Sequence, residues 1–283
     1  MEIRPVKLAD IETALTLVNT EGWDYAKEEV ERELLLNPGG SFFLADPDPI
    51  GIITTLFYGR TGVIGHLVVS RNARGRKVGQ SLLTHALGYL DDRGAESILL
   101  YATPEGERLY RKHGFSVRGI ARAVKAVNDG EFDHVRGPHI ARTVPEDLVQ
   151  IIDMDAKEFG DDRSKLIRHL YREFPQHCYK LEENNQITGY VLGRESSVAC
   201  DLGPWGCTSR NRTDAETLFG TCLKSMGRGA VFFGVFEENK QAWETANRLH
   251  IIRAWPVQFM VRGHGRYTVG LGNVFGIVGF ELG

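Results

Sequence analysis

Four basic side chains gather in one short loop that follows an apolar run at 63–69. They are Arg71, Arg74, Arg76 and Lys77. Gly75 and Gly79 lie in the same stretch and let the backbone come close to a ligand. A helix is predicted to start here, and the first amides of a helix have no partners within it, so they can bind an anion. The stretch favours a site for a phosphorylated ligand; the alternative is a solvated basic turn.

Two strands and two helices are predicted to position this loop. The apolar run at 63–69 is the first strand, and a helix follows the loop and ends at Gly94, where a left-handed C-terminal cap is expected. The apolar residues of that helix recur three and four positions apart, at Leu82, Leu83, Ala86, Leu87 and Leu90. A buried strand is then predicted at 97–102, and a second helix from Thr103-Pro104 to Gly114.

This order of elements, with Leu109-Tyr110 and Gly114-Phe115 at its end, resembles the two core motifs of the GNAT superfamily of acyl-CoA-dependent N-acetyltransferases. The resemblance covers the first 120 residues and implies that acetyl-CoA is the co-substrate and that no metal takes part. Lys77 departs from the family pattern, because a glycine is usual there. The residues assigned to acetyl-CoA are Leu67, Val68, Val69, Arg74, Gly75, Arg76, Lys77, Val78, Gly79 and Gln80.

The resemblance also implies catalytic roles. Tyr110 matches the tyrosine that protonates the departing thiolate, and a phenol with an ordinary pKa of ~10 holds its proton at neutral pH. The alternative for Tyr110 is a core residue that packs its helix against the sheet. The backbone amide of Val69 matches the amide that binds the thioester carbonyl.

His66 is the only titratable side chain on the strand at 63–69, so it is the candidate base that takes a proton from the acceptor amine. The positions where the family usually carries its base correspond to Val63 and Gly65. Side chains alternate along a strand, so His66 is expected on the opposite face unless a bulge redirects it. The alternative is a half-buried histidine with satisfied hydrogen bonds.

The segment before this strand is predicted to supply the acceptor site. Strands are expected at 3–6, 42–44 and 50–57, and helices at 9–18 and 26–36. In GNAT proteins the connection between these two helices lies over the acceptor. Here it carries Trp23, which we expect to line the acceptor pocket, and Asp24 or Glu21, which we expect to receive a cation. The alternative for Trp23 is a lid on the core.

The length of 283 residues predicts two domains, and the polar, turn-rich segment 127–138 places the boundary at 137/138. The resulting domains are 1–137 and 138–283. Residues 140–152 echo 3–15 at an offset of 137, which indicates duplication of a whole domain. In the second copy, 208–214 contains no glycine where a loop would approach phosphates, so no second acyl-CoA site is expected.

The second half resembles the divergent C-terminal domain of YitH/HolE-type tandem acetyltransferases, which implies a GNAT-like fold and a contribution to acceptor binding. The segments that carry this resemblance are 159–166, Gly189-Tyr190, Gly203-Pro204, 274–276 and 280–283. Within the first of them, Asp161, Asp162 and Arg163 either contact substrate or form the N-terminal cap of a helix at 164–170.

Composition narrows the partners. A net charge of −3 and a pI of 6.3 argue against nucleic acid as the main partner. The sequence contains no run of eighteen apolar residues, so no membrane span is predicted. Four cysteines without metal-type spacing, and no signal peptide, predict reduced thiols in the cytoplasm. The sequence leaves a homodimer open.

The sequence therefore predicts an α/β or α+β tandem GNAT fold whose second domain is degenerate. The expected activity is direct transfer of an acetyl group from acetyl-CoA to an amine of a small metabolite. Two alternatives stay open: an acyl-CoA-binding sensor without catalysis, and a protein N-terminal or lysine acetyltransferase.

Overall fold

The computed structural model describes residues 1–133, 137, 139–209, 211–263 and 272–283. Part of the segment expected at the domain boundary, 134–136 and 138, lies outside the described residues. No helix in the described part of the chain is long and apolar enough to cross a membrane.

The first half has the predicted elements and one long strand that the sequence did not indicate, β6. The strand at 97–102 has the predicted bounds, and each of the other predicted ends lies within three residues of the observed one. The elements are β1 (Glu2–Pro5), α1 (Ile11–Asn19), α2 (Lys27–Leu36), β2 (Phe42–Ala45), β3 (Pro49–Tyr58), β4 (Thr61–Val69), α3 (Val78–Asp91), β5 (Ser97–Ala102), α4 (Pro104–Lys112) and β6 (Ser116–Asn128).

The second half repeats this order. Helix α6 begins 137 positions after α2, and both ends of β9 lie 137 positions after those of β3. Asp10 and Asp147 also repeat one cap, because each carboxylate accepts the backbone N–H three residues earlier, at 2.9 and 2.8 Å. The elements are β7 (Ile140–Arg142), α5 (Leu148–Phe159), α6 (Ser164–Glu173), β8 (Cys178–Glu183), β9 (Gln186–Glu195), β10 (Cys200–Cys207), α7 (Arg212–Ser225), β11 (Gly229–Phe236), α8 (Lys240–Ala246), β12 (His250–Gly263) and β13 (Val274–Gly276).

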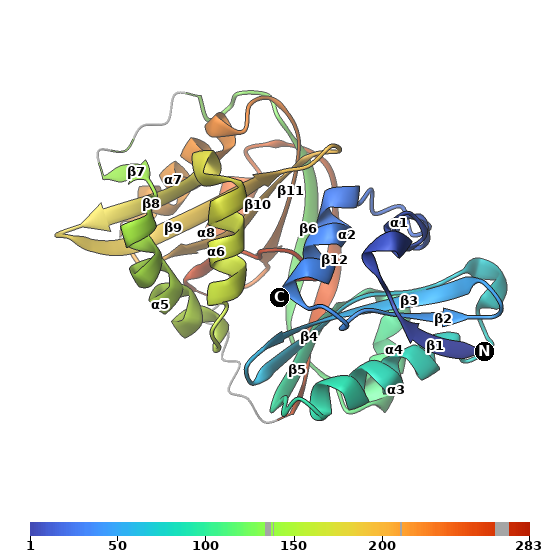
Figure 1. The fold of residues 1–283 in the computed structure, drawn as a ribbon. Coiled ribbons are helices and arrows are strands. Elements are labelled where there is room, and N and C mark those ends of the chain that lie inside the picture. The colour runs from blue at the N-terminus through green and yellow to red at the C-terminus, as the bar shows by residue number, and fades with distance from the viewer. Residues whose placement is uncertain (134–136, 138, 210, 264–271) are drawn as a thin grey trace.

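One mixed sheet runs through both halves (Figure 1). Its order is β1-β2-β3-β4-β5-β12-β6-β11-β10-β9-β8-β7, and β13 pairs with β10 outside this path. The two central strands are exchanged: β12 of the second half lies beside β5, and β6 of the first half lies beside β11. Each half therefore completes the sheet of the other.

Helices cover both faces of the first half's sheet (Figure 1). Phe42 and Leu44 pack in the cluster under α3, whereas Phe43 between them packs in the cluster under α1 and α2. Strand β2 is therefore apolar throughout, as a strand covered on both faces must be.

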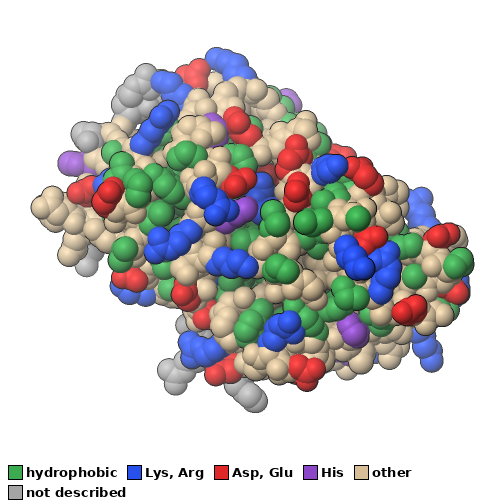
Figure 2. Space-filling view, in the orientation of Figure 1, with side chains coloured by type: hydrophobic (Ala, Val, Ile, Leu, Met, Phe, Trp, Pro, Cys, Tyr) green, Lys and Arg blue, Asp and Glu red, His purple; other side chains and the backbone are tan. Residues whose placement is uncertain are grey.

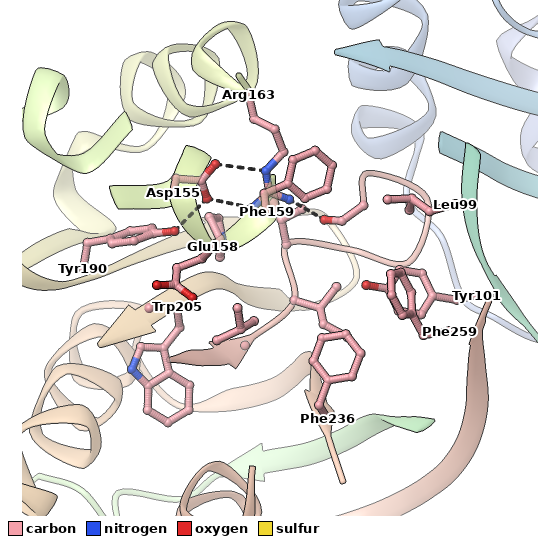
Figure 3. A pocket seen from close by; sticks show the side chains of 17 residues that line it. Leu99, Tyr101, Asp155, Glu158, Phe159, Arg163, Tyr190, Trp205, Phe236 and Phe259 are labelled. Atoms are coloured by element: carbon pink, nitrogen blue, oxygen red, sulfur yellow. Dashed lines mark hydrogen bonds and ion pairs between the residues drawn. The ribbon is translucent and has the colours of Figure 1, made fainter. Parts of the chain in front are cut away.

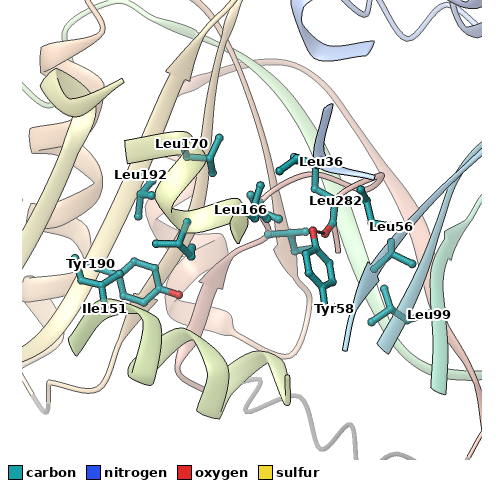
Figure 4. Packing of buried hydrophobic residues seen from close by; sticks show 14 of the residues in the cluster. Leu36, Leu56, Tyr58, Leu99, Ile151, Leu166, Leu170, Tyr190, Leu192 and Leu282 are labelled. Atoms are coloured by element: carbon teal, nitrogen blue, oxygen red, sulfur yellow. Dashed lines mark hydrogen bonds between the residues drawn. The ribbon is translucent and has the colours of Figure 1, made fainter. Parts of the chain in front are cut away.

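A hydrophobic core joins the halves (Figure 4). It includes Leu56 and Leu99 from the sheet of the first half, Leu166 and Leu192 from the second, and Leu282 near the end of the chain. These residues are at most 2% exposed. The two halves are therefore held by shared apolar burial as well as by the exchanged strands.

The last residues of the chain cross from the second half to the first. Strands β10 and β11 pair only at Cys200 and Asp201, and beyond that point β13 pairs with β10 while Ile277 bridges to Gly234 of β11. The segment then reaches the first half, where the Tyr58 hydroxyl donates to the Leu282 carbonyl at 2.8 Å. The chain ends between the two halves (Figure 1).

Candidate active site

Strand β4 leaves its parallel partner halfway along its length. It pairs with β5 from Thr61 to Ile64 and then only with β3, where the register shifts between Ile52 and Thr54. His66 lies opposite this irregularity with a φ of +36°, a backbone conformation that few residues other than glycine adopt. Residues 65–69 of β4 do not pair with β5, and we call this unpaired stretch the gap between β4 and β5; the bulge redirects the His66 side chain.

The loop after β4 forms a cradle at the start of α3. Gly75 has a φ of +78°, and Lys77 takes the left-handed conformation with a φ of +63° just before the helix. The side chain of the N-cap residue, Lys77, makes no capping hydrogen bond, so the first amides of α3 face the loop without a partner from that residue. This arrangement of amides fits a pyrophosphate, because bound phosphate oxygens would accept these hydrogen bonds.

Two of the loop's cations are already paired with carboxylates. Arg74 donates to the Val69 carbonyl at 3.1 Å and pairs with Glu21, and Arg76 donates to Asp46 at 2.5 Å. Within the described part of the chain no ion pair involves Lys77. Arg71 likewise has no ion pair among the described residues, so Arg71 and Lys77 are the cations of this loop that are left for a phosphate, and Lys77 lies next to the start of α3.

Lys77→Gly is expected to stabilise the protein. A side chain in the left-handed region costs about 1–2 kcal/mol, and the added flexibility of glycine takes back about 0.5–1 kcal/mol. We expect the free energy of unfolding in urea to rise by about 0.5–1 kcal/mol. Lys157→Gly on the exposed side of α5 is the control, and it should lower stability by about 1 kcal/mol. Equal losses in both variants would contradict the left-handed backbone at Lys77.

Tyr110 lies in the core beneath α3 and is 8% exposed. Its ring packs on Phe115 with centroids 5.9 Å apart, and a Cβ on Gly106 would come within 2.9 Å of the ring. Burial raises the pKa of Tyr110 well above 10. The structure thus shows the packing that the sequence offered as one alternative, and the role of Tyr110 toward the thiolate stays a prediction.

His66 is buried against α2 and the α1–α2 connection. Its Nδ1 lies 3.0 and 3.1 Å from the two carboxylate oxygens of Glu33, and the Tyr25 ring meets it edge-on at 4.4 Å between centroids. Burial lowers the pKa of His66, but the charge of Glu33 and its hydrogen bond outweigh that effect and raise it. His66 Nε2 is buried and has no hydrogen-bond partner among the described residues.

The connection before α2 contacts this histidine. Trp23 lies 6.1 Å from the His66 ring and packs on the cluster under α1 and α2. Asp24 pairs with Lys125 of β6 at 2.9 Å, and Glu21 pairs with Arg74 of the basic loop. The structure therefore brings Trp23 to His66, whereas the two acidic residues are engaged elsewhere. Whether Trp23 and Asp24 contact an acceptor stays a prediction.

Sequence reasoning missed a buried charged cluster between the halves. The cluster is centred on the Glu33–His66 pair, and its members influence one another electrostatically. They are Tyr25, Glu29, Arg32, Glu33, His66, Arg194, Asp201 and Glu281. One signal was available in α2, where charged residues at 29, 32 and 33 interleave with apolar residues at 30, 34 and 36. A helix whose apolar face carries charges at helical spacing buries those charges.

The pH dependence of stability is expected to report the ionisation of the Glu29 carboxyl group. Burial, and then the nearby charge of Asp201, raise the pKa of Glu29 to about 8. The folded protein therefore keeps a proton that the unfolded chain releases above its ordinary pKa of ~4.3. This contribution to stability is complete at low pH and is lost as the pH rises through 8.

Glu29→Gln removes the ionisable group. Its free energy of unfolding in urea should therefore rise relative to that of the wild type between pH 5 and pH 9. Glu28→Gln, on the exposed side of the same helix, should show no such trend. A stability difference for Glu29→Gln that stays constant with pH would show that Glu29 is ionised throughout.

A cavity of about 40 Å³ lies beside the last residues of the chain and is lined by residues of the second half together with Leu99 and Tyr101 of the first (Figure 3). Asp155 pairs with Arg163 at 2.7 Å and accepts the Tyr190 hydroxyl at 2.6 Å, and Arg163 also donates to the Gly283 oxygen. Arg163 thus anchors the end of the chain. Asp162 accepts the Ser164 amide at 2.6 Å, which is the capping role offered by the sequence.

The second half lacks the open gap and the uncapped helix of the first. Strand β13 and Ile277 occupy the space between β10 and β11. The Asn211 side chain accepts the Thr213 amide and caps α7, the counterpart of α3. Both features that would receive a cofactor in this half are therefore filled by the protein itself.

Comparison with known proteins places both halves in one family. The Acetyltransferase (GNAT) family matches residues 8–115, and an Acetyltransferase (GNAT) domain matches residues 151–276. The uncharacterized N-acetyltransferase YitH of Bacillus subtilis is 26% identical over 194 residues, which cover 67% of each chain.

Solved structures share the fold. A putative acetyltransferase from Pyrococcus horikoshii has a TM-score of 0.80 at 21% identity and covers 100% of this chain and 95% of its own. A GCN5-related N-acetyltransferase from Sphaerobacter thermophilus has a TM-score of 0.68 at 16% identity, with 92% and 95% covered. The chain belongs to the GNAT superfamily, carries two such domains in tandem and is an acetyltransferase.

Proposed function

We propose that this acetyltransferase moves an acetyl group directly from acetyl-CoA to the amine of a small molecule, and that only the first half binds acetyl-CoA. The observation that carries the proposal is the combination of the gap between β4 and β5 with the uncapped start of α3. The counterparts of both features in the second half are closed.

The candidate site residues of the first half then have distinct roles. The amides at 78–80 and the Lys77 ammonium bind the pyrophosphate, and the Val69 amide polarises the thioester carbonyl. Glu33 holds His66 with its Nδ1 proton toward the carboxylate, so Nε2 presents the lone pair that removes a proton from the amine. Tyr110 stabilises the departing thiolate with its hydroxyl proton.

A small acceptor is favoured over a peptide. Trp23 and Tyr25 stand against His66 from one side, and residues of the second half reach the same cluster from the other. A peptide would need an open groove at this point. On the face shown in Figure 2, acidic and basic side chains are interspersed, and we propose no nucleic-acid or membrane partner.

We keep the boundary at 137/138 as the proposed division in the chain, with the last long strand of each domain exchanged into the sheet of the other. The cytoplasm is the proposed location, which free thiols at all four cysteines support. A homodimer stays open.

Calorimetric titration of acetyl-CoA into the full chain tests the proposal. We expect one site per chain, followed by release of CoA when an amine acceptor is added. Two sites would contradict the division of roles between the halves, and no binding would remove acetyl-CoA from the proposal.

A further inference from the structure

The last residues of the chain lie against the point where β4 separates from β5. Glu281 is 6% exposed, and its carboxylate accepts the Tyr25 hydroxyl at 2.8 Å. A Cβ on Gly65 would lie 2.8 Å from the Glu281 Cβ, so only glycine allows this close approach. Gly65 is the first residue of β4 beyond its pairing with β5. A residue of the second half therefore stands where the gap of the first half begins.

Glu281 has no cationic partner within ion-pair distance in the described part of the chain, whereas Glu33 pairs with His66 and Asp201 lies 3.5 Å from Arg194. The buried acid Glu29 keeps its proton near neutral pH, because its pKa is raised to about 8, and the buried arginines nearby are Arg32 and Arg194. Arg194 is already engaged, since it donates to the Val278 carbonyl at 2.6 Å and lies 3.5 Å from Asp201. Unpaired negative charge is costly away from water. A bound cation would remove that cost.

His66 Nε2 adds an independent requirement. It belongs to a side chain that is 2% exposed, and it has no hydrogen-bond partner among the described residues. Because Nδ1 faces Glu33, the proton of the neutral ring lies on Nδ1 and Nε2 is left as an acceptor. A ligand that satisfies both the charge and this nitrogen must carry N–H groups and a positive charge.

We propose that Glu281 completes the acceptor site of the first half and holds the ammonium group of an alkylamine beside His66; this rests on the function proposed above. The ammonium gives one proton to His66 Nε2 and becomes a free amine. Its nitrogen then forms a C–N bond to the acetyl carbon while the C–S bond breaks. The nitrogen loses its second proton, and CoA leaves as the thiol. Acetyl-CoA and the ammonium ion thus yield the amide, CoA and one proton.

Binding of alkylammonium ions tests this assignment without turnover. Ethyl-, propyl- and butylammonium are titrated into the CoA-saturated full chain by NMR, with the matching alcohols as uncharged probes. Wild type should bind the ions and not the alcohols. Glu281→Gln should weaken binding about 10- to 100-fold, the value of a hydrogen bond to a charged group. Glu28→Gln, on the exposed side of α2, should change it less than about twofold.

A second variant guards against misfolding of the first. Tyr25→Phe removes the hydroxyl that holds the Glu281 carboxylate, and it should also weaken ion binding while CoA affinity stays unchanged. Equal affinity of Glu281→Gln and wild type, or no preference of wild type for ions over alcohols, would overturn the assignment. Wild type that binds the ions through Glu281 and acetylates none of them would instead refute the proposed reaction and leave the binding site standing.

Discussion

Tyr110→Phe should slow acetyl transfer about 10²- to 10³-fold, the range for loss of a hydrogen-bond donor that stabilises developing charge, with little change in stability. The ring keeps its packing against Phe115, and only the hydroxyl is lost. The rate is measured in a single turnover with an amine that the wild type acetylates, so that product release does not mask the chemical step.

The pH profile distinguishes two ways in which Tyr110 could act. Burial raises the pKa of Tyr110 well above 10, whereas a free thiol has a pKa of ~8.5. Complete proton transfer from this phenol to the thiolate is therefore unfavourable, and a hydrogen bond that stabilises the developing charge is favoured. Ionisation of Tyr110 should produce no loss of activity below pH ~10.

Tyr101→Phe is the matched control for this prediction. Tyr101 is a partly buried tyrosine whose pKa is also raised by burial, but it packs with Phe236, Phe259 and Phe280 against the core shared by the halves. Tyr110 belongs to the cluster under α3 instead. Tyr101→Phe should keep the single-turnover rate of wild type. A full rate in Tyr110→Phe would show that Tyr110 only packs.

Local patterns were enough to predict the elements of the first half up to the end of α4. Strand β5, the basic loop and helix α3 each follow from residues that are neighbours in the chain, such as the apolar spacing at 82–90 and the glycine at Gly94. The duplication could also be predicted, from the similarity of residues 3–15 and 140–152. Within these segments Asp10 and Asp147 form the same cap. Patterns of this kind need no knowledge of distant contacts.

The exchanged strands could not be predicted in the same way. Strand β6 was not predicted from the sequence. Local alternation also does not specify which strands lie beside β6 and β12, because pairing joins Ala123 to both Gly234 and Trp255. The direction of the His66 side chain depends on a bulge that is set by pairing with β3. Glu281 acts on His66 electrostatically from the far end of the chain. Three of the eight residues of the charged cluster, Arg194, Asp201 and Glu281, therefore join it only through contacts between the halves.

A substitution of Gly79, at the start of α3, can test acetyl-CoA binding separately from folding. A Cβ on Gly79 would lie 3.5 Å from Val69 Cγ2 and 3.8 Å from Leu109 Cδ2, which is ordinary contact, so Gly79→Ala should fold. Alanine is favoured over glycine in helices by up to about 1 kcal/mol, so stability should not fall. Against a bound pyrophosphate, however, the added methyl group would occupy the space in which phosphate oxygens meet the amides at 78–80.

Gly79→Ala should therefore weaken acetyl-CoA binding at least about 100-fold, because hydrogen bonds to charged groups contribute ~1.5–3 kcal/mol each. Gly88→Ala is the control: it lies on the exposed side of the same helix with no atom within 4 Å of the new methyl group. It should be equally stable or more so and bind acetyl-CoA like wild type in calorimetry. If Gly79→Ala also binds like wild type, the pyrophosphate does not lie on α3, since a methyl group at this position cannot be avoided by a ligand that contacts these amides.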